Sequence, residues 1–182
     1  MSEQLPSEEE ALEILRKSGC SLNVIKHCIA VAELAVEIAE RCKARNLDVD
    51  VQLVKIGALL HDVGRSKTHS INHVIVGAEI AKDLNLPPRI ISIIERHVGG
   101  GITPEEAKEL GWPDKSYMPE TLEEKIVSYA DKLIEGSRRV PITWTLERFK
   151  VKLGADHPAI GRIMDLHEEL SQLCKDLRLL RT

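Results

Sequence analysis

Aromatic side chains are scarce in this 182-residue chain, which has one Phe, two Tyr and two Trp. Aliphatic residues must therefore build the core, and their abundance together with many Glu, Lys and Arg favours helices over a β-sandwich. No segment alternates between apolar and polar residues at the period of two that marks a half-buried strand. The expected fold class is all-α, in a single domain over residues 1–182.

The chain also lacks an excess of positive charge, since its formal net charge is −4 and its pI is about 6.0. This balance argues against the capture of a nucleic-acid polymer. The longest apolar runs, residues 56–60 and 90–94, are too short to cross a bilayer. Because the first ten residues do not read as a signal peptide, we expect a cytoplasmic protein without a membrane partner.

Cysteine pairs at the C-x-x-C spacing of zinc and redox sites are absent. The four cysteines are far apart in the sequence, at Cys20, Cys28, Cys42 and Cys174. Three of them fall in expected helices, and Cys28 and Cys42 have apolar neighbours. We expect buried, reduced thiols and no structural zinc site.

Helices are indicated by apolar residues at steps of three and four, and by capping boxes at Ser7–Glu10 and Thr121–Glu124. Glycine and proline mark most of the helix ends. The expected helices cover residues 7–19, 21–45, 48 or 50 to 64, 72–84, 87–99, 103–110, 121–138, 143–153 and 158–180.

Five titratable residues lie on the inward faces of five of these helices: His27, His61, His73, His97 and Asp131. Taken singly, each has an ordinary alternative as a hydrogen-bonded core histidine or a capping aspartate. Burying a carboxylate without a compensating charge is costly, however. Because a divalent cation supplies that charge, the set as a whole predicts a metal site. Asp62 joins it if the helix unwinds before Gly64, since adjacent residues on a helix diverge by ~100°.

The run His-Asp-Val-Gly at residues 61–64 resembles the HDIG-type signature of the HD-domain metal-dependent phosphohydrolases. The resemblance covers residues 22–138, because the whole set of ligand residues is present in the order found in this superfamily. Within the superfamily, the sequence is most similar to the symmetrical diadenosine-tetraphosphate hydrolases. The similarity lies in the spacing of His73 and Gly77, the glycines after His97, and residues 121–131. No Gly-Tyr-Pro extension follows His97, which disfavours a cyclic-di-GMP phosphodiesterase. The resemblance implies a helical HD bundle with a C-terminal helical extension at residues 141–182.

The resemblance also implies a set of four ligands for one ion, namely His27, His61, Asp62 and Asp131. Asp62 would bridge to a second ion bound by His73 and His97. Ligands rich in imidazole favour Mn, Fe, Co, Ni or Zn over Mg. Two such ions ~3.5–4 Å apart would activate a water for attack on phosphorus. The expected function is hydrolysis of a nucleotide or another small phosphoester.

Basic residues near the ligands are candidates to bind a phosphate. Arg65 lies in the polar loop after Asp62, where a solvated cation at a helix C-terminus is the alternative. Arg138 lies seven residues after Asp131, two turns along the same face if the helix continues. Asp62, Arg65 and Arg138 are therefore the expected catalytic residues, whereas Lys67 and His69 are expected to be solvated.

Other residues receive ordinary assignments. We expect Trp112 and Tyr117 to anchor a loop and not to stack on a base, and His157 and His167 to lie on the surface. The segment after residue 141 either covers the core or forms a homodimer interface.

Two other functions are compatible with the sequence. HD-fold di-iron oxygenases use the same types of ligand, so the ligand residues alone do not distinguish an oxygenase from a hydrolase. A non-catalytic ligand-sensing module is disfavoured, because no ligand of the set is missing.

Overall fold

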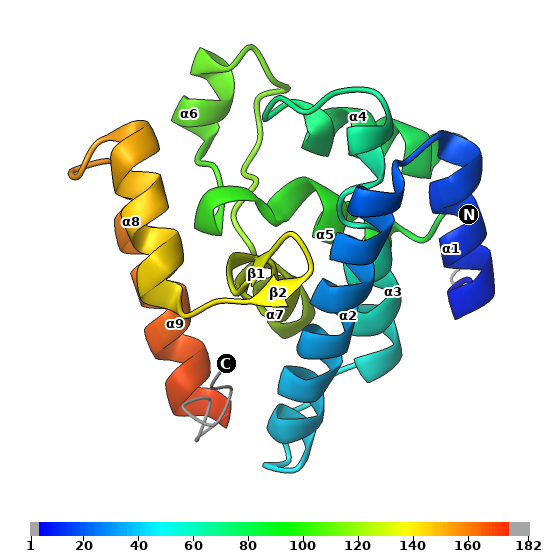
Figure 1. Ribbon diagram of the computed structural model, residues 1–182, viewed down its shortest axis with the longest axis horizontal. Helices are drawn as coiled ribbons and strands as arrows, with labels where there is room; N and C mark the ends of the chain where they lie inside the picture. The colour runs from blue at the N-terminus through cyan, green and yellow to red at the C-terminus, as the bar shows by residue number, and fades with distance from the viewer. Residues whose placement is uncertain (1–3, 175–182) are drawn as a thin grey trace.

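The computed structural model describes residues 4–174, which form α-helices, two short 3₁₀ turns and one small hairpin (Figure 1). The expected all-α class is confirmed. In chain order the elements are α1 (Glu8–Ser18), α2 (Leu22–Lys43), α3 (Val51–Leu60), η1 (Val63–Ser66), α4 (His73–Asp83), α5 (Pro88–Arg96), η2 (Val98–Gly100), α6 (Pro104–Glu109), α7 (Leu122–Lys132), β1 (Ile134–Glu135), β2 (Arg138–Arg139), α8 (Ile142–Leu153) and α9 (Pro158–Cys174).

Helix starts follow the local sequence. Both predicted capping boxes are present, with Ser7 before α1 and Thr121 before α7. Asp50 begins α3 by accepting a hydrogen bond from the backbone N–H of Leu53, 3.0 Å away. These side chains satisfy N–H groups that have no partner inside the helix, so the starting points are encoded locally.

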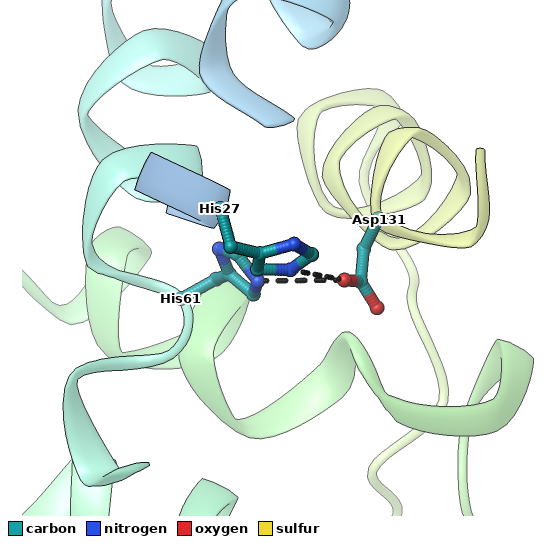
Figure 2. A group of neighbouring side chains, drawn as sticks. All are labelled: His27, His61 and Asp131. Atoms are coloured by element: carbon teal, nitrogen blue, oxygen red, sulfur yellow. Dashed lines mark hydrogen bonds and ion pairs between the residues drawn. The ribbon is translucent and has the colours of Figure 1, made fainter. Parts of the chain in front are cut away.

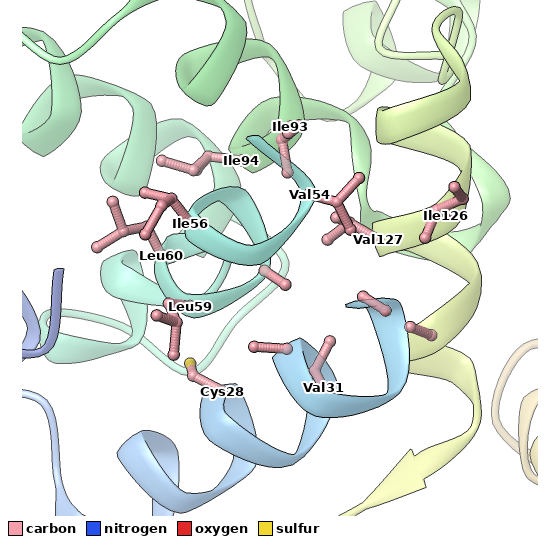
Figure 3. Close-up of a cluster of buried hydrophobic side chains, with 14 of the residues drawn as sticks. Cys28, Val31, Val54, Ile56, Leu59, Leu60, Ile93, Ile94, Ile126 and Val127 are labelled. Carbon is pink, nitrogen blue, oxygen red and sulfur yellow. The ribbon is translucent and has the colours of Figure 1, made fainter. Parts of the chain in front are cut away.

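The core lies where α2, α3, α5 and α7 meet (Figure 3). Its side chains are almost all aliphatic, as the shortage of aromatics requires; they include Val31, Val54, Ile56, Ile93, Ile94 and Val127. Gly57 permits close contact of α3 with α5, since a Cβ there would lie 2.4 Å from Cδ1 of Ile93. This core holds the helices that carry the titratable residues.

Gly64 does not end the third helix, as the sequence had suggested. Helix α3 ends at Leu60, four residues earlier, and Gly64 lies within the η1 turn. A Cβ on Gly64 would lie 1.9 Å from the carbonyl oxygen of His73 and 2.6 Å from the backbone nitrogen of Gly77. The glycine therefore allows α4 to pack directly on the His61–Asp62 turn.

The predicted helix from 121 to 138 is too long, because α7 ends at Lys132. The chain then turns through Gly136, whose φ of +61° suits glycine, into the antiparallel pair β1–β2. Arg138 lies exposed on β2, so the prediction that it shares a helical face with Asp131 is wrong.

The expectation of four reduced thiols is also wrong. Cys42 in α2 and Cys174 at the end of α9 form a disulfide, with their Cα atoms 4.8 Å apart. The pairing arises because α9 returns along α2, although 132 residues separate the two cysteines. Cys20 and Cys28 are buried free thiols, as expected.

The C-terminal helices pack against the rest of the molecule, and α8 lies beside α9 (Figure 1). Gly100 allows α9 to approach η2, since a Cβ there would lie 3.1 Å from Arg162. Leu166 and Leu170 of α9 join the core. The helix predicted to reach residue 180 extends to Cys174, and its remaining residues lie outside those described. Within residues 4–174, no helix is long and apolar enough to cross a membrane.

Candidate metal centre

Six titratable residues from five parts of the chain converge on one site. His27 comes from α2, His61 and Asp62 follow α3, and His73 is the first residue of α4. His97 follows α5, and Asp131 lies near the end of α7. His61, Asp62, His73 and His97 are at most 3% exposed. The structure thus brings together all six residues that the sequence predicted as ligands.

Backbone carbonyls orient each of the four imidazoles. The Nδ1 of His27 contacts the oxygen of Gly136 at 2.8 Å, and that of His61 contacts the oxygen of Ala58 at 2.6 Å. Nδ1 of His73 contacts the carbonyl oxygen of Ser70, and Nδ1 of His97 contacts that of Ile94, each at 2.8 Å. Because a carbonyl only accepts, each Nδ1 carries the proton and donates it. Each neutral ring then presents the lone pair of Nε2 to the centre, which is the orientation of metal-binding histidines.

The first group of ligand atoms surrounds one oxygen of Asp131 (Figure 2). Its Oδ1 lies 3.0 Å from Nε2 of His27 and 3.5 Å from Nε2 of His61. Oδ2 of Asp62 is 3.8 Å and 3.7 Å from the same two nitrogens. Two imidazoles and two carboxylates therefore share one small volume.

The second group surrounds the other oxygen of Asp62. Its Oδ1 lies 3.1 Å from Nε2 of His73 and 3.5 Å from Nε2 of His97. The two nitrogens are 3.2 Å apart. Because the two oxygens of Asp62 face different groups, this carboxylate lies between them.

The donor set fits bound cations. Nε2 of His61 and Oδ1 of Asp62 are buried and have no hydrogen-bond partner among residues 4–174. Lone pairs of imidazoles and carboxylates that face one another without a hydrogen need a positive charge between them. Four imidazole nitrogens and two carboxylates match the preferences of divalent transition metals.

The protonation states also suit a metal. Burial opposes ionisation of Asp62, but the surrounding imidazoles of His61, His73 and His97 hold the pKa of this carboxyl well below its usual range. Burial likewise opposes ionisation of Asp131, and the charge of Lys132 outweighs it and lowers that pKa. Burial lowers the pKa of His97 to about 4, so this ring is neutral near pH 7. Ionised carboxylates and a neutral imidazole are the forms that bind metal.

Lys132 is a part of the site that the sequence did not reveal. Its side chain is 6% exposed, and Nζ donates to Oδ2 of Asp131 at 2.5 Å and to the carbonyl of His97 at 3.1 Å. The contact with Oδ2 leaves Oδ1 of Asp131 facing His27 and His61. Adjacent residues on a continuous helix diverge, so no periodicity argument pairs Asp131 with Lys132. Lys132 is the last residue of α7, and only the structure shows its contacts with Asp131 and His97.

The basic residues near the ligands differ in where they lie relative to the cavity. Arg65 borders the centre, since its Nε donates to Oδ2 of Asp62 at 2.6 Å. His69 lines the cavity in front of the ligands, together with Arg65. Lys67 and Arg138 are absent from the described residues that line this cavity. The catalytic role of Arg138 stays a prediction, without the helical geometry on which it was based.

The assignments of the two outlying aromatic residues are confirmed, whereas those of the two outlying histidines are wrong. Trp112 and Tyr117 belong to a small buried cluster, and Nε1 of Trp112 donates to Oδ1 of Asn72 at 2.8 Å. They anchor the loop, as expected. His167 differs from its predicted surface position, because it is half-buried on α9 with Nδ1 2.6 Å from the hydroxyl of Tyr129. His157 is also partly buried and lines the cavity.

Comparison with known proteins places this site in a family. Residues 24–135, which contain all six ligands, match the HD domain. The chain belongs to the HD-domain family. The expected membership of the HD-domain metal-dependent phosphohydrolase superfamily is thereby confirmed, and with it the coarser expectation that the site binds divalent metal.

Two relatives each align with more than nine-tenths of this HD domain. An uncharacterized protein of Methanocaldococcus jannaschii is 52% identical over 167 residues, which cover 92% of this chain and 98% of the relative. A tRNA (cytidine(56)-2'-O)-methyltransferase of Picrophilus torridus is 44% identical over 170 residues, 93% of this chain. This HD domain spans only 48% of that methyltransferase.

The fold of this HD domain is also found among solved structures. The HD domain of the L. monocytogenes phosphodiesterase PgpH, in complex with cyclic-di-AMP, matches with a TM-score of 0.54 and 19% identity. The match covers 90% of this chain and 96% of that one, and it shows a shared fold.

Proposed function

We propose that this HD domain is a hydrolase that cleaves a phosphoester bond in a nucleotide or another small phosphorylated compound, using two divalent transition-metal ions. The observation that carries the proposal is the position of Asp62, whose two oxygens face two groups of inward-pointing imidazole nitrogens. A single buried ion would not need lone pairs on both sides of one carboxylate.

The residues present divide into two sets of ligands. His27, His61 and Asp131 would hold one ion together with Oδ2 of Asp62. His73 and His97 would hold the other with Oδ1 of Asp62, which leaves fewer protein ligands and more room for water and substrate. When bound, such ions supply Lewis-acid activation of a phosphoryl oxygen and lower the pKa of a water.

The surrounding side chains would hold the ligands and bind the phosphate. Lys132 fixes the orientation of Asp131, and Arg65 contacts Asp62 through Nε alone at 2.6 Å. Arg65 also lines the cavity, and its Nη1 donates to the carbonyl oxygen of His69 at 3.5 Å. A charged, planar donor there suits a phosphate oxygen.

The test is hydrolysis by metal-reconstituted protein under anaerobic conditions, followed as phosphate release from monoesters and by chromatography of the products from diesters and dinucleotides. Substrates would be mononucleotides, dinucleotides, cyclic dinucleotides, glycerol phosphate and a short RNA, with Mn, Fe, Co, Ni or Zn in turn. We expect turnover of at least one small phosphoester and its loss in Asp62→Ala. The matched control is Met164→Ala, which alters an exposed side chain on α9.

The number of metal ions bound per chain tests the assignment of ligands to two ions. Elemental analysis should give two ions per chain for the wild type, near zero for Asp62→Ala and one for His73→Ala. Full metal without turnover of any substrate would contradict the proposal. A mixed-valence iron signal in that case would support the di-iron oxygenase instead.

A further inference from the structure

The cavity above the metal ligands continues well beyond them. Its volume is about 1310 Å³, and it reaches from Asp62 and Asp131 to the whole length of α8. Residues of the loop 69–71 and of α6 also line it. A phosphate at the metal centre would occupy only the end of the cavity that the ligands line, so the remaining space suits another part of a substrate.

The upper part of this cleft gathers exposed apolar side chains. In the described part of the chain, eight large hydrophobic residues are exposed. Five of them line this cleft, namely Ile71, Leu110, Trp144, Val151 and Leu153. Such a concentration next to a polar centre marks a ligand-binding surface, whereas scattered apolar residues do not.

Helix α8 is fixed where it meets the metal centre. Thr145 is buried and its hydroxyl donates to the carbonyl oxygen of Lys132 at 2.5 Å. The side chain of the same lysine contacts Asp131, so α8 and a metal ligand share one anchor. Trp144, Arg148 and Val151 follow at steps of four and three along α8, and all three line the cleft.

Trp144 offers a planar surface in this cleft. Its side chain is 37% exposed, and the guanidinium of Arg148 lies 4.8 Å from the centre of its ring. Arg148 is itself held by an ion pair with Glu135 of β1. An exposed indole with a guanidinium over its ring is the kind of surface on which a nucleobase stacks.

The charges of the cleft favour a small ligand over a polymer. Among the described residues that line it, six are Asp or Glu and four are Lys or Arg. A groove for a nucleic-acid backbone needs an excess of cations. Glu147 and Lys152 of α8 line the same cleft, and their polar ends are able to bond to the edge of a base. An aliphatic chain would cover these groups without bonding to them.

We propose that the cleft selects a mononucleotide or dinucleotide whose base stacks on Trp144 of α8, with its phosphate at the metal centre. This inference rests on the proposed hydrolase function and adds a specificity-determining residue to it. Trp144 would bind the base and take no part in the bond cleavage.

The test compares a nucleotide with glycerol phosphate as substrates of the metal-loaded protein. For Trp144→Ala we expect KM for the nucleotide to rise about tenfold, because one stacking contact is lost. Its kcat and metal content should stay within about twofold, and KM for glycerol phosphate should not change. Trp144→Phe should retain most of the affinity, and Met164→Ala should behave as wild type.

A binding measurement makes the inference testable without turnover. Adding AMP should quench the tryptophan fluorescence of the wild type, and Trp144→Phe should lose the quenching, since Trp112 is buried. Quenching by AMP without phosphate release would uphold the stacking surface while the hydrolase proposal fails. Unchanged quenching in Trp144→Phe would overturn the inference. The inference would also be overturned if Trp144→Ala changed KM equally for the nucleotide and glycerol phosphate, or if it altered only the oligomeric state. A preference of the protein for a prenyl phosphate over a nucleotide would overturn it as well.

Discussion

Hydrogen bonds from backbone carbonyls decide which nitrogen each histidine of the centre presents. The carbonyls belong to different elements, and the one for His27 comes from Gly136 in the β1–β2 turn. The short hairpin therefore orients a ligand on α2 that is 109 residues away. Outer contacts of this kind raise the basicity of the ligand and fix its tautomer.

Lys132 should control the metal affinity of the first set of ligands. We expect Lys132→Met to weaken binding of one ion about 10–100-fold, because Asp131 then loses the contact that orients it. Lys132→Arg should recover part of the affinity. Competition titration against a metal-binding dye measures the effect.

The control for this prediction is on the same helix. Lys125 of α7 forms an ion pair with Glu169 at 2.6 Å, on a partly exposed part of α7. Lys125→Met should leave the metal affinity unchanged. Equal affinities of Lys132→Met and the wild type would show that Lys132 does not position Asp131.

At the scale of elements, the site depends on how closely neighbouring segments approach. Gly64 of η1 and Gly77 of α4 lie against each other, and a Cβ on Gly77 would be 3.2 Å from the nitrogen of Gly64. This contact brings the first residue of α4, His73, next to Asp62. Small residues are required because backbone meets backbone.

Gly64→Ala should push α4 away from the His61–Asp62 turn. We expect a loss of about 1–3 kcal/mol in the free energy of unfolding, as for other overpacked sites. The ion held by His73 should also be lost. Gly161→Ala in α9 is the matched control, because no described atom lies within 4 Å of its added Cβ. Urea denaturation and elemental analysis measure both effects, and a fully loaded Gly64→Ala protein would contradict the prediction.

The contact between α7 and α9 should depend on pH. Burial lowers the pKa of His167, and nearby Glu168 only partly offsets this. The unfolded chain therefore takes up a proton below pH ~6.5, while the folded chain keeps this ring neutral. Its contribution to stability is fully present above pH ~6.5 and decreases as the pH falls toward the folded pKa.

Urea denaturation at pH 7.5 and 5.5 tests this sign. His167→Gln should show a smaller loss of stability between the two pH values than the wild type, because Gln does not titrate. The other histidines titrate in both proteins, so they do not affect the comparison. An identical loss in both would exclude His167 as a contributor.

At the scale of the whole molecule, the candidate metal ligands connect five helices. They come from α2, the end of α3, α4, the end of α5 and α7. An ion bound by groups from so many elements stabilises the folded chain only, since the unfolded chain does not bring them together. Folding and metal binding are therefore coupled.

Removal of metal with a chelator should lower the Tm. At a free metal concentration of ~100 times the Kd, the ion contributes about 2.7 kcal/mol, which corresponds to a shift of about 5–10 °C for a chain of this size. Differential scanning fluorimetry with and without EDTA measures it. Asp62→Ala should show no shift, and an equal shift in that variant would mean that EDTA acts elsewhere.

The sequence by itself determined the all-helical class and the six residues that converge as candidate metal ligands. His27 and Asp131 could be placed because the period of 3.6 residues fixes the face of a helix on which a side chain lies. The inward direction of a carboxylate then required a cation, whatever the details of packing. Trp112 and Tyr117 could likewise be assigned as anchors from their local setting.

Only the tertiary structure decided the features that depend on contacts between distant segments. The end of α7 at Lys132 moved Arg138 out of the predicted face. The side chain of Lys132 was found on Asp131, although neighbouring residues on a helix diverge. The return of α9 along α2 paired Cys42 with Cys174. The placement of α8 put Trp144 in the same cavity as the metal centre. Local sequence encodes where a helix begins and which face is apolar, but helix ends and long-range neighbours follow from which contacts bury the most surface at once.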